Sequence, residues 1–436
     1  MDTNRTGDFK RKILPLIQVP LYSNALYLII KSGVTSFLGF FFWIVVARFY
    51  TQAVVGFSSA VLSAINLLTI ISLVGLNTLL VRRLPGTGEP SRLINTCLTI
   101  SGGISVLVAV IFIAGIDFWS PAIVFISEHI IFAVAFVSFT LLSTLAALID
   151  TSFVALRRAG FTLYRDTIFS LLKIPLPILF LPFLLTFGIV SSWGIALCIS
   201  LLISFFIFLP RIQSGYRPIP GLKLHLIRDL GHYTTGNYLA NLFTAAPGFI
   251  LPLMVVNSLG AEINAFFYIP WTIAGAIFSI PIAISSSLFA ESSHFEEQMR
   301  ENVIRSVKFS LALLIPAVIL LVLAGKWVLL AFGESYSANG LLLLQVMAIS
   351  SLPLSINSIY TSVLRVTYRT KELVAFRGLM SAGALLASYL AMSVIGIIGV
   401  GYGWLGIQTL ATIYIMLFRR QAITNIKESD SSRSEN

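Results

Sequence analysis

Twelve long apolar segments dominate this chain, and they leave little room for any fold outside a membrane. Each has about the 20 residues that a helix needs to cross the hydrocarbon core of a bilayer. Only 11% of the residues are charged and 57% are hydrophobic, whereas a soluble chain carries about 25% charged residues. The sequence predicts an all-α polytopic membrane protein with about 12 transmembrane helices. The expected spans are residues 24–47, 53–80, 93–116, 121–150, 167–187, 190–210, 233–257, 263–289, 306–325, 339–364, 373–395 and 398–418.

Basic residues indicate the orientation of these spans. Of the 29 Lys and Arg residues, 23 fall in the N-terminal segment, the C-terminal tail and every second connection between spans. Because Lys and Arg near span ends resist translocation, these segments are expected on the cytoplasmic side. The prediction is a multi-pass protein of the cell (plasma or inner) membrane with both termini cytoplasmic.

The net charge of +11 does not indicate a nucleic-acid partner. The basic residues are spread thinly over seven segments beside lipid, where orientation and anionic headgroups account for them. Membrane lipids are the expected partners, and no nucleic acid is expected.

A proline-containing connection divides the chain into two halves of six spans each. A faint gap-free repeat supports two parallel six-helix repeats. It aligns Gly39 with Gly248, Val46 with Val255 and Phe57 with Phe266. The predicted organisation is a cytoplasmic N-terminal segment at 1–23, an N-terminal lobe at 24–210, a cytoplasmic linker at 211–230, a C-terminal lobe at 231–418 and a cytoplasmic tail at 419–436.

Four basic residues lie inside the expected spans, each near the cytoplasmic end. Lys308 and Arg377 are close enough to span ends for snorkelling, in which a long side chain lifts its charge to the headgroups. Lys31 and Lys173 lie deeper, where an unpaired cation costs at least ~2.5 kcal/mol. A polar cavity or a charge partner is therefore expected for these two lysines.

Polar residues form stripes along three spans. Asn24 and Lys31 share one helical face of the first span because of their spacing. Two readings stay open for the asparagines, lining of a cavity or close helix–helix contact. The cavity candidates are Asn24, Asn66, Asn77, Asn237 and Asn241.

Asp150 is the one carboxylate expected in the inner half of a span. It is a candidate charge partner for Lys31 or Lys173, and an ion pair with Arg157 or Arg158 on the same helix is the alternative. Exporters of cationic drugs usually need a buried carboxylate. The deep charges here are mostly positive, which favours an anionic cargo.

No catalytic or metal-binding signature is present in the sequence. The four histidines are not spaced for metal ligation, and there is no Gly-x-x-x-x-Gly-Lys loop for nucleotide phosphates. We therefore expect a protein that is not an enzyme, with no catalytic residues, no metal and no cofactor.

The sequence resembles the polysaccharide or oligosaccharide (Wzx-like) flippases of the MOP superfamily, which also contains MATE exporters and lipid II flippases. One matching piece lies between residues 24 and 85, and the other between residues 150 and 177. The motifs are Gly39-Phe40-Phe41-Phe42-Trp43, Ala47-Arg48-Phe49-Tyr50, Val55-Gly56, Gly75-Leu76-Asn77, Arg82-Arg83-Leu84-Pro85, Ala155-Leu156-Arg157-Arg158 and Lys173-Ile174-Pro175-Leu176-Pro177.

This resemblance implies a MATE-like fold with two six-helix lobes around a central cavity. It also implies a cargo made of a polyprenyl lipid, a phosphate or pyrophosphate, and a glycan. Cationic cavity residues of such flippases hold the phosphate, and Lys31, Arg48 and Lys173 are the matching candidates in this chain.

The predicted function is flipping of a lipid-linked oligosaccharide from the cytoplasmic face to the outer face of the membrane by alternating access. It would serve the assembly of cell-surface polysaccharide or glycan. Glycan polymerases or glycosyltransferases of the same pathway are further expected partners. A MATE-type drug or metabolite exporter is the alternative. A membrane glycan ligase or polymerase is less favoured, because the external loops are short.

Overall fold

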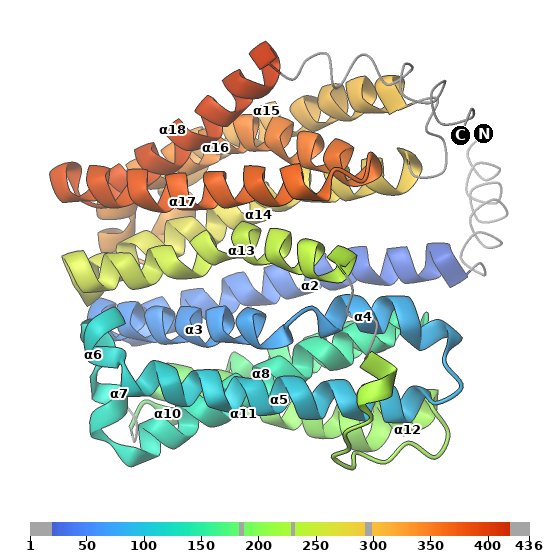
Figure 1. Ribbon diagram of the computed structural model, residues 1–436. Coiled ribbons are helices and arrows are strands. Elements are labelled where there is room, and N and C mark those ends of the chain that lie inside the picture. The colour runs from blue at the N-terminus through green and yellow to red at the C-terminus, as the bar shows by residue number, and fades with distance from the viewer. Residues whose placement is uncertain (1–19, 183–186, 228–231, 293–298, 419–436) are drawn as a thin grey trace, which may run out of the picture. The chain divides into compact units, whose positions relative to one another are not determined.

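Long helices make up nearly all of the chain in the computed structural model (Figure 1), which describes residues 20–182, 187–227, 232–292 and 299–418. The described residues contain no β-strand. Eleven of their helices are long and apolar enough to cross a membrane. The protein is therefore a multi-pass membrane protein, and the expected all-α class is confirmed. The two termini, predicted to be cytoplasmic, lie outside the described residues.

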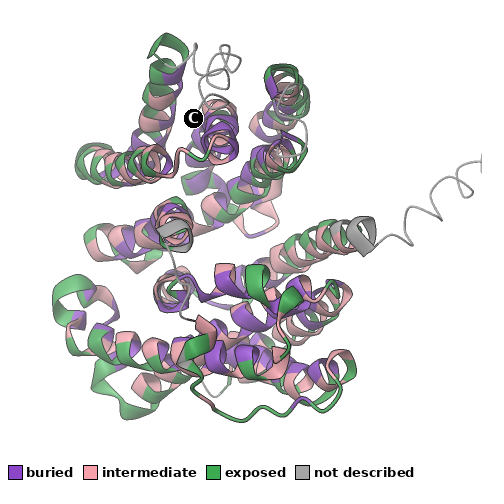
Figure 2. Cartoon of the chain, turned by 45° about the vertical axis from the view of Figure 1, so that its right-hand side comes forward, coloured by how far each residue is buried: buried purple, intermediate pink, exposed green. Residues whose placement is uncertain are grey.

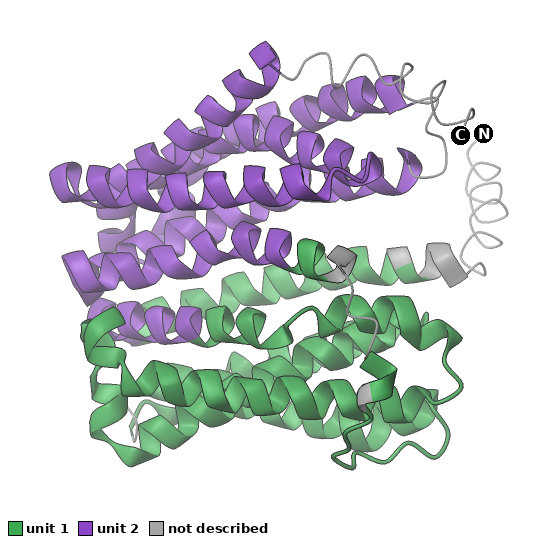
Figure 3. Cartoon of the chain, in the orientation of Figure 1, with its two compact units in different colours: residues 1–49, 65–238 green, residues 50–64, 239–436 purple. Residues whose placement is uncertain are grey.

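The chain divides into two compact units, coloured separately in Figure 3. Unit 1 comprises Met1–Phe49 and Ile65–Tyr238, and unit 2 comprises Tyr50–Ala64 and Leu239–Asn436. The first part of α3 (Gln52–Leu73) thus groups with unit 2. The predicted lobe limits at 24–210 and 231–418 remain a prediction.

In unit 1, the apolar core lies among α4, α5, α8 and α11. Leu80, Ile94, Leu148 and Phe153 are completely buried there. The helices of this unit, beside the second part of α3, are α2 (Pro20–Phe49), α4 (Leu76–Arg83), α5 (Pro90–Ala114), α6 (Ile116–Trp119), α7 (Phe125–Glu128), α8 (Ile130–Ala155), α9 (Gly160–Lys173), α10 (Leu176–Phe180), α11 (Gly188–Ile203) and α12 (Leu209–Ile212).

In unit 2, α14 and α15 both pack along α16, and α17 packs against α18. Gly56 and Asn264 join the first part of α3 to α14, because the Asn264 Nδ2 donates to the Gly56 carbonyl at 2.8 Å. The helices of this unit are the part of α13 (His232–Leu259) from Leu239 onward, α14 (Ala261–Ser292), α15 (Met299–Leu330), α16 (Glu334–Val366), α17 (Thr370–Ile395) and α18 (Ile397–Phe418).

Two of the predicted spans are divided. The second span breaks between α3 and α4, where Val74 and Gly75 adopt the left-handed backbone conformation, with φ of 46° and 81°. The fifth span begins earlier than expected, at Gly160, and α9 ends at Lys173. Pro175 and Pro177 follow directly, and a proline supplies no backbone N–H for a continuing helix. This break is why eleven continuous helices are found where twelve spans were expected.

The internal repeat coincides with helix boundaries. In the register that aligns Gly39 with Gly248, the first residue of α3, Gln52, aligns with the first residue of α14, Ala261. Both helix pairs, α2 with α3 and α13 with α14, are joined by only one or two residues. The repeat therefore relates equivalent helical hairpins.

The predicted linker at 211–230 packs onto α5 over its described part. Asn95 donates to the Arg217 carbonyl at 2.8 Å and accepts a bond from the Tyr216 hydroxyl at 2.7 Å. Thr99 accepts from the Gly221 amide at 3.1 Å. Polar side chains at the start of α5 thus tie this segment to unit 1.

Exposed apolar side chains cover much of the helical surface, and Figure 2 shows exposed and buried residues alternating around the long helices. On α17, Leu379 and Val394 are 76% and 81% exposed. Water would disfavour so much exposed hydrocarbon, whereas lipid tails solvate it. This surface is the one that a membrane protein presents to the bilayer.

Candidate functional site: a charged network in unit 1

Lys31 lies on α2, which packs against α9. About two turns before it, the Asn24 Oδ1 accepts a hydrogen bond at 3.0 Å from the backbone N–H of Ala159. Ala159 directly precedes α9, where backbone N–H groups have no partner within the helix. The Tyr27 ring packs over Gly160, where a Cβ would be in ordinary van der Waals contact with it at 3.5 Å. Asn24 therefore fixes α2 on the start of α9 and sets the position of Lys31.

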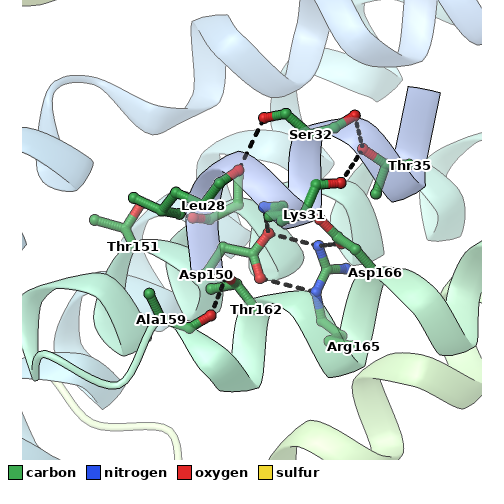
Figure 4. A network of polar contacts seen from close by, with 11 residues as sticks. Leu28, Lys31, Ser32, Thr35, Asp150, Thr151, Ala159, Thr162, Arg165 and Asp166 are labelled. Atoms are coloured by element: carbon green, nitrogen blue, oxygen red, sulfur yellow. Dashed lines mark hydrogen bonds and ion pairs between the residues drawn. The ribbon is translucent and has the colours of Figure 1, made fainter. Parts of the chain in front are cut away.

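Four charged side chains from three helices meet at this place, as Figure 4 shows. The Lys31 Nζ lies 2.7 Å from Asp166 Oδ2 and 3.4 Å from Asp150 Oδ2. Arg165 donates from Nε to Asp150 Oδ1 at 2.8 Å and from Nη2 to Asp150 Oδ2 at 2.5 Å. It also contacts Asp166 through Nη2. Each carboxylate is thus held by both cations.

The network is largely shielded from solvent and its formal charges cancel. The side chains of Arg165 and Asp166 are 7% and 11% exposed, and those of Asp150 and Lys31 are 18% and 22% exposed. Burying charged groups costs several kcal/mol per ion unless partners compensate. Two carboxylates and two cations provide that compensation. Lys31 is therefore a neutralised lysine in this state.

Lys173 ends α9 two turns beyond Asp166, in a different environment. Its Nζ lies 4.7 Å from the Phe169 ring centroid and 5.1 Å from that of Phe42 on α2. Cations are attracted to the faces of aromatic rings at such distances. Among the described residues, no carboxylate lies within 4 Å of this half-buried ammonium. Lys173 thus adds one positive charge beside the neutral network.

The predicted site residues do not all come together. Arg48 is an exposed residue at the other end of α2, and the 17 residues that separate it from Lys31 span about 25 Å of helix. Asn66 on α3 is half-buried, and the buried Oδ1 of Asn77 on α4 accepts no hydrogen bond from the described residues. These residues therefore form no direct contact group with Lys31.

Two further predicted site residues, Asn237 and Asn241, lie on α13. Asn237 is half-buried, and Asn241 is exposed and accepts a hydrogen bond from Arg365 Nη2 at 3.0 Å. On α3, Ser59 donates to the Gly56 carbonyl and accepts from Asn264 Nδ2, and Ser63 donates to the Ser59 carbonyl.

Sequence reasoning missed Arg165 and Asp166. The predicted span began at residue 167, so Arg165 was assigned to a loop and Asp166 was not considered. In the structure α9 begins at Gly160, which places both residues inside a helix that faces Lys31. A signal existed, because Asp166 and Lys173 are seven residues apart and share a helical face. The expectation that Asp150 is the one carboxylate at this depth is therefore wrong.

Comparison with known proteins relies on the fold. No family model matches the sequence, and no curated protein sequence matches it. A multidrug resistance MATE transporter of the MOP superfamily in an inward-facing conformation is 16% identical, with a TM-score of 0.68 over 91% of this chain and 96% of that chain. The lipid II flippase MurJ in an inward closed conformation is 12% identical, with a TM-score of 0.72 over 92% and 90%.

The chain has the MOP-superfamily fold. The MATE-like two-lobed architecture expected from the sequence is thereby confirmed. A MOP-superfamily transporter from Pyrococcus furiosus Vc1 also shares the MOP fold, at 14% identity and a TM-score of 0.61 over 94% of this chain and 97% of that one. For that protein, a reverse polarity of the binding pocket suggests a different function. The likeness in fold therefore does not assign a cargo to this chain.

Proposed function

We propose that this protein flips a polyprenyl-(pyro)phosphate-linked oligosaccharide from the cytoplasmic to the outer face of the cell membrane. Support comes from the MOP fold, which the lipid II flippase MurJ shares, and from a cation available to a phosphate. No covalent chemistry is required, so the protein acts as a transporter and not as an enzyme.

The observation that carries the proposal is the state of Lys173. Its ammonium lies among aromatic rings with no carboxylate within 4 Å among the described residues. An incoming phosphate can pair with it without displacing an internal anion. Charge-assisted bonds to phosphate are about twice as strong as neutral ones. Lys173 is therefore the proposed first contact of the cargo phosphate.

Lys31 would take part in a second step. It already pairs with Asp166 at 2.7 Å, so a phosphate must compete with that carboxylate. If the cargo wins, Asp166 still keeps Arg165 as a partner. The exchange would couple cargo binding to the contact between α2 and α9, and hence to a change of state. We propose that Arg48 contacts the cargo phosphate in the outward-open state only.

Alternating access would complete the cycle. The glycan would pass through a polar cavity while the polyprenyl tail stays in lipid. Both termini would lie in the cytoplasm, and polymerases or glycosyltransferases of the same pathway would act on the flipped product.

A second candidate is a MATE-type exporter of a drug or metabolite. Asp150 and Asp166 favour it, because carboxylates within membrane helices are what a cationic cargo needs. Both are engaged by Lys31 and Arg165, so a cationic cargo would first have to displace an internal cation.

Deletion of the gene in the native host tests the two candidates against each other. Polyprenyl lipids are extracted, and the glycan is labelled with a membrane-impermeant reagent on intact cells. Accumulation of lipid-linked glycan that the reagent cannot reach supports the flippase. Unchanged lipid intermediates together with raised sensitivity to cationic compounds would contradict it and favour the exporter.

A further inference from the structure

Four helices of unit 2 converge on a pocket far along the chain from Lys31. Residues from α13, α16, α17 and α18 line it, among them Phe243, Thr361, Arg377 and Trp404. The cavity has a volume of about 90 Å³. A single water molecule needs about 10–15 Å³ of such space. The pocket is thus large enough for one small group of a solute or lipid.

Arg377 is the charged residue of this pocket. Its Nη1 donates to the Ala240 carbonyl and its Nη2 to the Thr361 hydroxyl, both at 3.2 Å. A guanidinium has five N–H donors, so most of its capacity is unused. No carboxylate lies within 4 Å of it among the described residues. Snorkelling, expected from the sequence, does not describe a guanidinium held between α13 and α16.

A second cation reaches the same turn of α13. Arg365 donates to Asn241 Oδ1 at 3.0 Å, next to the Ala240 carbonyl that Arg377 contacts. The positive charge of Arg365 repels that of Arg377. Two cations that disfavour each other gain from an anion placed nearby.

Trp404 also lines this pocket and has an unused donor. The residue is only 8% exposed, and its buried Nε1 donates no hydrogen bond within the described residues. Its ring packs edge-on against Trp271 at 5.2 Å between centroids, so the indole orientation is fixed by packing. A buried N–H without an acceptor is unfavourable, because it has lost its hydrogen bond to water. An acceptor supplied by a ligand would satisfy it.

Gln408 adds a further donor, and the geometry assigns which end of its amide faces which partner. Asn357 Nδ2 donates at 2.9 Å to the Gln408 main-chain carbonyl, which can only accept. The same nitrogen lies 2.7 Å from Gln408 Oε1. The oxygen of Gln408 therefore faces Asn357, and its Nε2 makes no hydrogen bond within the described part of the chain. Gln408 lines the pocket although it is only 4% exposed.

We propose that this pocket of unit 2 binds an oxyanion, a carboxylate or phosphate group, through Arg377, Trp404 and Gln408. Within the described residues, the donors of Trp404 and Gln408 have no acceptor and most donors of Arg377 are unused, which fits an acceptor-only group. The planar guanidinium matches the two oxygens of a carboxylate or phosphate. The bearer of that group is an acidic sugar or sugar phosphate in solution, or the headgroup of an anionic lipid. The inference does not depend on the proposed cargo or on Lys31 and Lys173.

Binding of glucuronate to the purified full-length protein in phosphatidylcholine nanodiscs tests the site. Isothermal titration calorimetry should detect glucuronate but not glucose, which has the same ring without the carboxylate. Inorganic phosphate should compete with glucuronate. Arg377→Gln should abolish binding, and Arg377→Lys should weaken it because the planar fork is lost.

Two further variants keep the test independent of folding. Trp404→Phe removes the indole N–H but keeps an aromatic ring, and should weaken binding about tenfold. Lys326→Gln removes an exposed cation on α15 and should leave the affinity unchanged. Equal affinity of the Arg377→Gln and wild-type proteins for glucuronate would overturn the proposal.

The lipid composition of the nanodisc distinguishes a lipid headgroup from a soluble ligand. If phosphatidylglycerol occupies the pocket, native mass spectrometry should show retained phosphatidylglycerol that Arg377→Gln loses, and glucuronate should bind more weakly in nanodiscs that contain this lipid. Absence of both glucuronate binding and Arg377-dependent lipid retention would also overturn the proposal. Failure of this test would leave the flipping assay unaffected, because that assay reads lipid-linked glycan directly.

Discussion

The Lys31 ammonium and the Asp166 carboxylate form a 2.7 Å ion pair that joins α2 to α9. The two residues are 135 positions apart in sequence and belong to the same unit. Arg165 and Asp150 complete the group, so that each charge is compensated by two opposite ones. This arrangement makes the network both a structural clamp and a place where a charged cargo could intervene.

Removal of Lys31 should destabilise unit 1. Lys31→Ala leaves Asp150 and Asp166 with Arg165 alone, and an uncompensated buried charge costs about 3–5 kcal/mol. Because Lys31 is 22% exposed, we expect the lower end of that range. The apparent Tm of the purified protein, followed by tryptophan fluorescence, should fall clearly.

A double-mutant cycle isolates this pair. Lys31→Ala combined with Asp166→Ala should cost less than the sum of the two single changes, because neither residue then leaves an unpaired partner. Strict additivity of the two effects would show that the 2.7 Å contact contributes nothing.

Lys173 should matter for transport more than for stability. Lys173→Gln removes the cation but keeps a polar chain of similar length, and only weak contacts with Phe42 and Phe169 are lost, about 0.5–2 kcal/mol. In the deletion strain, the variant should reach normal protein levels yet leave lipid-linked glycan inaccessible from outside. Lys173→Arg, which keeps the charge, should restore part of the transport. The matched control is Lys326→Gln, and full transport by Lys173→Gln would remove Lys173 from the site.

The cap that Asn24 provides to α9 should be measurable. Asn24→Ala deletes the acceptor of the Ala159 N–H, and loss of such a cap costs about 1 kcal/mol. Asn24→Asp keeps the acceptor and adds a negative charge that a helix N-terminus favours. The apparent Tm should therefore drop for the alanine variant and remain close to wild type for the aspartate variant. Equal drops for both would contradict the assigned role.

Gly56 should tolerate no side chain. A Cβ at this position would lie 1.7 Å from the Ala261 carbonyl oxygen, a backbone atom that cannot rotate away. Gly56→Ala should therefore lower the yield of folded protein sharply in size-exclusion chromatography. Gly39→Ala is the control, since nothing lies within 4 Å of its Cβ and alanine favours helix by about 1 kcal/mol. A normal yield of Gly56→Ala would show that α3 and α14 do not pack this closely.

The candidate site was only partly predictable. We could single out Lys31, Lys173 and Asp150 because each is a charged residue within an apolar span, where water does not solvate it. Arg165 and Asp166 were not, since the prolines at 175 and 177 end α9 early and its start at Gly160 carries no strong sequence signal. In the sequence, Trp404 and Gln408 look like ordinary members of an apolar span. Only the contact with Asn357 shows that the amide nitrogen of Gln408 has no hydrogen-bond partner among the described residues.

The sequence by itself determined that the chain lies in a lipid bilayer, that it is helical, and where nearly every span approximately lies. These properties depend on local composition, because a chain in lipid must satisfy its backbone within each segment. The tertiary structure alone decided which charges neutralise one another and which remain available. Ion pairs form between side chains that are close in space, and the 134 residues between Lys31 and Asp166 carry no sign that α2 and α9 would meet. The same holds for Arg377: that no carboxylate of the described residues pairs with it becomes visible only when four helices of unit 2 surround it.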